Sequence, residues 1–155
     1  QINAPAPDFP HTLEGGDADR GRNLFMNHIA AQCIRCHKVK DGKGSDIGPN
    51  LKSAGLQGRS HHLEAIVDPQ KTITEGYGSI SLTLENGQSI AGLFKSEMKG
   101  VIEIKDAEGV ITRVASENVK ERTPVISTMP PMGTILTKRE IRDIIEYLST
   151  LKSKK

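Results

Sequence analysis

The chain has 155 residues, which is the length of one ordinary domain and argues against a large multidomain enzyme. Its 35% of hydrophobic and 26% of charged residues are typical of a globular protein, and no apolar run approaches the roughly 20 residues that span a bilayer. The net charge of +2 and the few aromatic residues (three Phe, two Tyr, no Trp) argue against nucleic acid as a partner.

The first predicted elements are an arm and a helix. Residues 1–16 include three Pro and show no periodicity, so we expect an extended N-terminal arm. Asp17 can cap a helix over residues 18–31. Three residues spaced four apart would share one face of this helix: Gly21, Phe25 and Ile29.

The only two cysteines stand in the run Cys33-Ile34-Arg35-Cys36-His37, which is the attachment signature of c-type haem. Two thiols three positions apart can bond to the two vinyl groups of one porphyrin, and His37 can then ligate the iron from one face. A structural zinc site would need a second Cys pair, and a thioredoxin-like redox motif would need strands and helices alternating around it. The motif therefore predicts one covalently attached haem c.

Beyond the motif, the sequence predicts a loop and a second helix. The loop covers residues 38–44 and is followed by the run Gly48-Pro49-Asn50-Leu51. Ser60 can cap the helix, which should end near Val67, because Asp68 precedes a proline and such residues avoid the helical region.

From about Tyr77 the hydrophobic period changes from helical to alternating. Glu85-Asn86-Gly87 has the composition of a hairpin turn between a strand that contains Ile80, Leu82 and Leu84 and a return strand over residues 90–94. Two further strands are expected at residues 101–105 and 110–114. These four short strands predict a small antiparallel β unit, barrel-like in kind, at residues 76–122.

The last predicted helix has the clearest start signal. Thr137 and Glu140 form a capping box. Its apolar stripe would pack on the helix that carries Gly21, because glycine allows two backbones to approach closely. This stripe contains Ile141, Ile144, Ile145, Leu148 and Leu151.

Together the elements predict a mainly α fold, with three to four helices around one haem. The haem-binding domain would consist of residues 17–75 and 123–155, and the β unit at residues 76–122 would be a separately folding insert. We hypothesise that this insert covers a haem edge.

A loop before the last helix offers a sixth ligand for the iron. Met129 is the favoured residue, since thioether sulfur suits iron in an electron carrier and the following prolines restrict the loop. The alternatives are an open site or one of five other side chains: Met132, Met98, His28, His61 and His62.

The order of these features resembles class I cytochromes c. The resemblance rests on the first helix, the Cys33-to-His37 motif, Gly48-Pro49-Asn50-Leu51, the Met-Pro loop and the terminal helix. More narrowly, the chain resembles a haem-binding domain type described from planctomycetes and verrucomicrobia (Pirellula/Verrucomicrobium type). This narrower resemblance rests on Gly58-Arg59, the helix end at Asp68-Pro69, the strand unit and Ser127-Thr128-Met129-Pro130.

The resemblance implies thioether bonds at Cys33 and Cys36, proximal ligation of the iron by His37 and distal ligation by Met129. It also implies that the Pro49 carbonyl accepts a hydrogen bond from the second ring nitrogen of His37.

The same resemblance points to two further side chains as candidates for contact with a haem propionate. Arg59 matches the family arginine at that position, and a solvated loop charge is the alternative. Tyr77 is a weaker candidate, for which a core or edge-strand position is the alternative.

Iron with His and Met as axial ligands has no vacant position for a substrate, so we expect an electron carrier and not an enzyme. Redox partner proteins are expected, among them a fused or associated dehydrogenase. Haem attachment to such motifs occurs outside the cytoplasm, which implies a periplasmic location. Two other classes stay open: a haem sensor or peroxidase with a labile distal ligand, and a protein-docking module with accessory haem.

Overall fold

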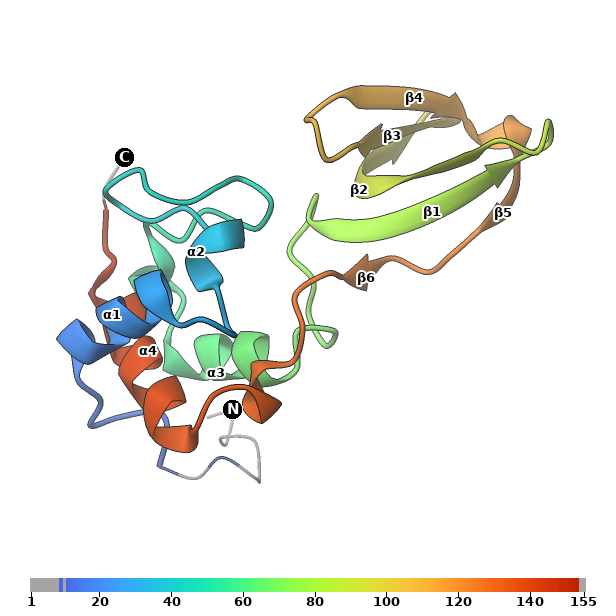
Figure 1. The fold of residues 1–155 in the computed structure, drawn as a ribbon. Coiled ribbons are helices and arrows are strands. Elements are labelled where there is room, and N and C mark those ends of the chain that lie inside the picture. The colour runs from blue at the N-terminus through green and yellow to red at the C-terminus, as the bar shows by residue number, and fades with distance from the viewer. Residues whose placement is uncertain (1–8, 10, 154–155) are drawn as a thin grey trace. The chain divides into compact units, whose positions relative to one another are not determined.

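The computed structural model describes residue 9 and residues 11–153 (Figure 1). These residues form two compact units. The helical unit comprises the described parts of residues 1–72 and 129–155, and the sheet unit comprises Ile73–Thr128. Most of the expected arm, residues 1–8 and 10, lies outside the described residues, and the described residues before Asp17 form no helix or strand.

The helical unit contains four α-helices and two short 3-10 helices. In chain order these are α1 (Ala18–Asn27), α2 (Cys33–Cys36), η1 (Ala54–Leu56), α3 (Arg59–Val67), η3 (Met132–Thr134) and α4 (Lys138–Thr150). No helix in the described part of the chain has both the length and the apolar composition needed to cross a membrane.

Helix α1 begins as predicted but ends four residues early. The Asp17 side chain accepts a hydrogen bond from the Arg20 N–H and caps the helix. At the other end, the backbone of His28 is extended, and its Nδ1 accepts hydrogen bonds from the N–H groups of Ala30 at 3.3 Å and Ala31 at 3.1 Å. The His28 side chain thereby replaces the carbonyl groups that would accept from these amides in a longer helix, and the helix ends. Ile29, which was expected on the buried face, is 88% exposed.

Helix α3 starts one residue before the predicted cap. Gly58, with a φ of 86°, occupies the N-cap position, and Ser60 lies inside the helix. A positive φ of this kind suits glycine, so the turn into α3 depends on Gly58. The helix ends at Val67, as predicted.

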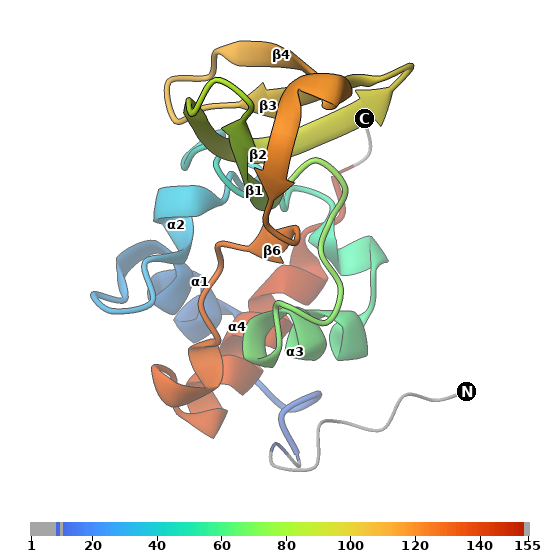
Figure 2. The ribbon, with the colours of Figure 1, turned by 90° about the vertical axis from the view of Figure 1, so that its right-hand side faces the viewer.

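Helices α1 and α4 pack closely in the helical unit (Figures 1 and 2). The predicted capping box of Thr137 and Glu140 is present. The five stripe residues of α4 are at most 6% exposed: Ile141, Ile144, Ile145, Leu148 and Leu151. A Cβ on Gly21 would lie 1.9 Å from the Asp143 carbonyl oxygen, so the predicted close approach at this glycine is confirmed.

The sheet unit contains one antiparallel sheet. Its strands are β1 (Gly78–Leu84), β2 (Ser89–Met98), β3 (Val101–Lys105), β4 (Ile111–Ala115), β5 (Val119–Arg122) and β6 (Ile126–Ser127). Their order is β4-β3-β2-β1-β5, with β6 also pairing with β1, and most of it can be followed in Figure 2. A separate core of Ile80, Leu82, Ile102, Ile104 and Val114 lies on one face of this sheet.

The prediction of a mainly α fold with a small β insert is therefore wrong. Helices account for 31% and strands for 23% of the structure, and the strands form a six-stranded sheet. The strand pattern underestimated β2, which has ten residues, and missed β5 and β6. In β5 one Val precedes three charged residues, so no alternation marks it, and its strand conformation depends on pairing with β1.

Candidate functional site

The two cysteines occupy the ends of the single helical turn α2. Positions i and i+3 lie on one face of a helix, so Cys33 and Cys36 are neighbours, and both are free thiols. The N–H of His37 donates to the Cys33 carbonyl at 3.0 Å and closes the turn. The fold therefore presents two thiols and an imidazole from five consecutive residues.

The loop after His37 folds back on α2 and satisfies its last carbonyl groups. The Ser45 hydroxyl donates to the Arg35 carbonyl at 2.6 Å, and the Gly48 N–H donates to the Cys36 carbonyl at 2.6 Å. A four-residue helix has few hydrogen bonds of its own, so these contacts hold its C-terminal end.

The imidazole of His37 is oriented by Pro49, whose carbonyl oxygen lies 2.8 Å from Nδ1. This is the contact that the resemblance implies. Because a carbonyl oxygen only accepts, Nδ1 must carry the proton, and the lone pair of the neutral ring lies on Nε2. Burial lowers the pKa of His37, although the hydrogen bond to Pro49 opposes this shift, so the ring stays neutral at pH 7.

Two glycines that sequence reasoning did not single out for this role make room for His37. A Cβ on Gly48 would lie 2.8 Å from the His37 ring atom Cε1, and a Cβ on Gly44 would lie 2.0 Å from the His37 carbonyl oxygen. Gly44 also has a φ of 103°, which disfavours other residues. The sequence signal for this role is the close spacing of glycines after the Cys33-to-His37 motif.

The thiol of Cys33 is not activated. Burial raises its pKa to about 11, so it stays protonated near neutral pH. Reactive redox cysteines have lowered pKa values, and this property argues against a thioredoxin-like role for the pair.

The three candidate methionines lie in different surroundings. Met132 is 6% exposed and belongs to the core of the helical unit, in η3. Met129 is partly buried and packs against the same core. Met98 lies in the sheet unit and is 69% exposed.

Each of the candidate histidines contacts other groups of the protein. His28 accepts two backbone hydrogen bonds with Nδ1 and lies 3.8 Å from a Glu140 oxygen through Nε2. His62 is 4% exposed, and its Nε2 lies 2.8 Å from the Ala54 carbonyl oxygen. His61 is exposed and contacts the His62 ring edge-on.

The structure pairs Arg59 with Glu146, 87 residues away. The two guanidinium nitrogens lie 2.6 and 3.1 Å from the carboxylate oxygens, and one of them also donates to the Leu13 carbonyl at 2.9 Å. No local signal could have revealed this partner. The propionate role of Arg59 stays a prediction.

Tyr77, the weaker propionate candidate, lies in the sheet unit. The amine of Lys95 is 4.9 Å from the centre of the Tyr77 ring and donates to the Gly76 carbonyl at 2.8 Å. The ring thus has a structural contact within its own unit.

No protein-family model matches the chain. It is 32% identical over 110 residues to a cytochrome c of Cochliobolus lunatus, a match that covers 68% of this chain and 96% of that protein. The chain belongs to the cytochrome c family. A cytochrome c of Arabidopsis thaliana is 32% identical over 107 residues, which cover 66% of this chain and 90% of that protein. A cytochrome c of Stellaria longipes is 48% identical over 44 residues, or 28% of this chain and 35% of that protein.

Cytochromes c are haem proteins of electron transfer, and the residues around α2 fit a haem. They provide two free thiols on one turn and an imidazole whose Nδ1 is held by Pro49, which leaves the lone pair on Nε2. Within residues 9 and 11–153, no three His, Cys, Asp or Glu side chains cluster as ligands of a metal ion.

Proposed function

We propose that this cytochrome c carries single electrons through one covalently attached haem c. Cys33 and Cys36 would form the thioether bonds, and His37 and Met129 would be the axial ligands. The observation that carries the proposal is the hydrogen bond between His37 Nδ1 and the Pro49 carbonyl, because it presents Nε2 in the form that ligates iron.

When bound, the haem supplies a one-electron change between ferric and ferrous iron. The protein's part is to hold the ligands in place. Pro49 and Gly48 restrict the ring of His37, and the hydrogen bonds of the 45–48 loop hold the turn that carries both thiols. A rigid ligand set of this kind suits an electron carrier, whose ligands should be the same in both oxidation states.

Met129 is favoured over Met132 by its surroundings. The Met132 side chain is 6% exposed and packs among the core residues of the helical unit, which is the role of a core side chain. Met129 lies just before two prolines, outside any regular element, and packs on the same core with a partly exposed side chain.

We also propose a functional class, a family type, a location and partners for this protein. Two protein ligands on the iron leave no position for a substrate, so the chain is proposed as a carrier and not an enzyme. We place it in the planctomycete and verrucomicrobial type of haem-binding domain and in the periplasm. Its partners would be redox proteins, including a fused or associated dehydrogenase.

Two substitutions test the ligand set. Met129→Ala should abolish the weak near-infrared band of ferric Met-ligated haem and lower the reduction potential, because a thioether favours ferrous iron. Met132→Ala should keep the band but lower the free energy of unfolding by about 3 kcal/mol, since it removes a buried side chain. In all variants the haem should stay with the polypeptide during acid-acetone extraction, because thioether bonds are covalent.

An exchange of the two spectra would assign the distal ligand to Met132. A band unchanged in both variants would exclude both methionines. Carbon monoxide binding to the ferrous wild-type protein would indicate the alternative class of sensor or peroxidase with a labile ligand.

A further inference from the structure

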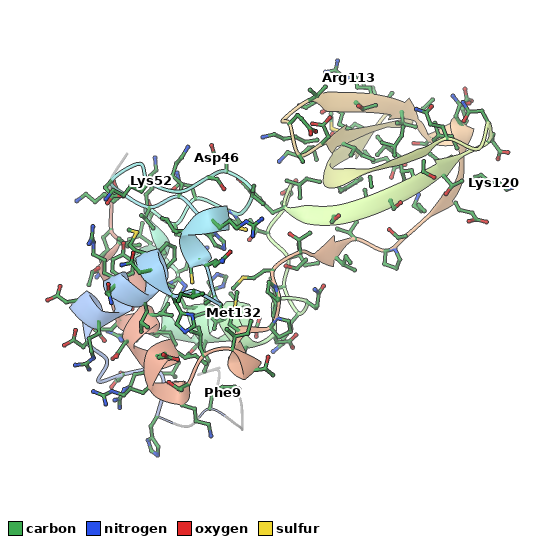
Figure 3. All side chains as sticks on the ribbon, viewed as in Figure 1. Phe9, Asp46, Lys52, Arg113, Lys120 and Met132 are labelled. Atoms are coloured by element: carbon green, nitrogen blue, oxygen red, sulfur yellow. The ribbon has the colours of Figure 1, made fainter. Side chains whose placement is uncertain are left out.

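An aromatic side chain from the N-terminal arm packs on the loop that carries the proposed distal ligand. Phe9 and Met132 are both labelled on the helical unit in Figure 3. A Cβ on Gly133 would lie 2.7 Å from Phe9 Cζ, so the ring fills the space that a side chain at Gly133 would need. Phe9 therefore contacts η3 at Gly133, which follows Met129 by four residues.

Hydrogen bonds hold the residues that follow Phe9 in the chain. Thr12 is 1% exposed, and its hydroxyl donates to the Phe9 carbonyl at 2.8 Å. The carbonyl of Leu13 accepts a hydrogen bond from Arg59 on α3, which is held in turn by two contacts to Glu146 on α4. Leu13, close after Phe9 in the chain, is thereby joined to α3 and α4.

The ring itself is also held by α4. The amine of Lys138, the first residue of this helix, lies 5.9 Å from the centre of the Phe9 ring, within the range of a cation–π contact. Phe9 packs against the same hydrophobic core as Met129 and Met132. The ring thus bridges the anchored arm, η3 and the start of α4.

We propose that Phe9 is a positioning residue for the distal ligand. By packing on Gly133, it keeps residues 129–134 closed against the core and so holds the Met129 thioether in reach of the iron. This inference rests on the proposed ligation by Met129. It assigns to Phe9 control over how readily the distal ligand leaves.

The test uses the haem-loaded protein and imidazole, which competes with a methionine for ferric iron. Phe9→Ala should raise the association rate of imidazole about tenfold, because the loop opens more often. Gly133→Ala, whose methyl displaces the ring, should act in the same direction, and Phe9→Leu should restore part of the wild-type rate. Amide hydrogen exchange at Ile135 and Leu136, which both donate to the Met132 carbonyl, should accelerate in parallel.

Leu24→Ala is the matched control, since Leu24 also packs partly buried against this core but from α1. Its imidazole rate should stay at the wild-type value. An unchanged rate in Phe9→Ala, or an equal rise in Leu24→Ala, would overturn the inference while Met129→Ala still loses the near-infrared band. Retention of that band in Met129→Ala would instead refute the proposed ligation and the inference with it.

Discussion

The His37 imidazole shows how single residues define this site. Pro49 accepts the hydrogen bond of Nδ1 and thereby selects the tautomer, while Gly48 leaves the space into which the ring fits. Neither neighbour contributes a charged or reactive group. The chemistry of the histidine thus depends on a backbone carbonyl and on the absence of a side chain.

Gly48→Ala should displace the His37 ring. The added methyl would lie 2.8 Å from Cε1, and overpacking of this kind lowers the free energy of unfolding by about 1–3 kcal/mol. Urea unfolding of the haem-loaded protein measures the loss, and a shifted reduction potential would report the moved ligand. The control is Ile47→Ala, an adjacent residue that is 51% exposed, for which less than about 0.5 kcal/mol is expected. Equal effects of the two substitutions would contradict the role of Gly48.

Helices α1 and α4 are joined by an ion pair as well as by close packing. The carboxylate of Asp143, which is 2% exposed, accepts from Arg20 Nε at 2.9 Å and from the Asp17 N–H at 2.8 Å. A side chain of α4 therefore holds the first turn of α1. This contact lies beside Gly21, where the two backbones approach most closely.

Asp143 should make the stability of the helical unit pH-dependent. Burial raises the pKa of its carboxyl, but hydrogen bonds from Arg20 and the Asp17 N–H outweigh burial and lower it below the usual 3.8. Because the folded-state pKa is depressed, the stabilisation is present above pH 3.8 and is lost as the pH falls through the folded-state value. Asp143→Asn should cost about 2 kcal/mol near neutral pH, and this cost should shrink in strong acid.

Thermal unfolding of both proteins across the acid range measures this difference. Asp19→Asn on the exposed face of α1 is the control and should leave stability within about 0.5 kcal/mol. A constant cost of Asp143→Asn at every pH would exclude the assigned titration.

At the scale of the whole molecule, the chain holds two hydrophobic cores. The core of the helical unit centres on α1, α3 and α4, and the core of the sheet unit is formed by the strands alone. Each unit thus has its own source of stability. Two separate cores make it possible for the units to unfold in separate steps.

Ile104→Ala should destabilise the sheet unit alone. The side chain is 1% exposed, and its truncation should lower the unfolding free energy of that unit by about 3 kcal/mol. Ile144→Ala, 2% exposed in α4, is the reciprocal control for the helical unit. Calorimetry should show one of two transitions shifting in each variant, with haem absorbance following the helical transition. A single transition that shifts in both variants would show that the units unfold together.

Features that arise from contacts between neighbouring residues could be predicted from the amino-acid sequence. The Cys33-to-His37 motif, the capping box of α4, the Asp17 cap and the first β-hairpin all arise from contacts within a few positions, so their signals are local. The buried stripe of α4 also followed from its helical period.

Features that depend on partners far apart in the chain could be identified only in the folded protein. The Arg59–Glu146 pair and the contact of Phe9 with Gly133 join residues that are far apart in the chain, and neither side chain indicates its partner. Strands β5 and β6 exist because β1 offers them hydrogen bonds, which made the fold class more β-rich than the hydrophobic pattern predicts. The physical reason is that local patterns record a residue's preference, whereas packing and strand pairing depend on which surfaces the folded chain brings together.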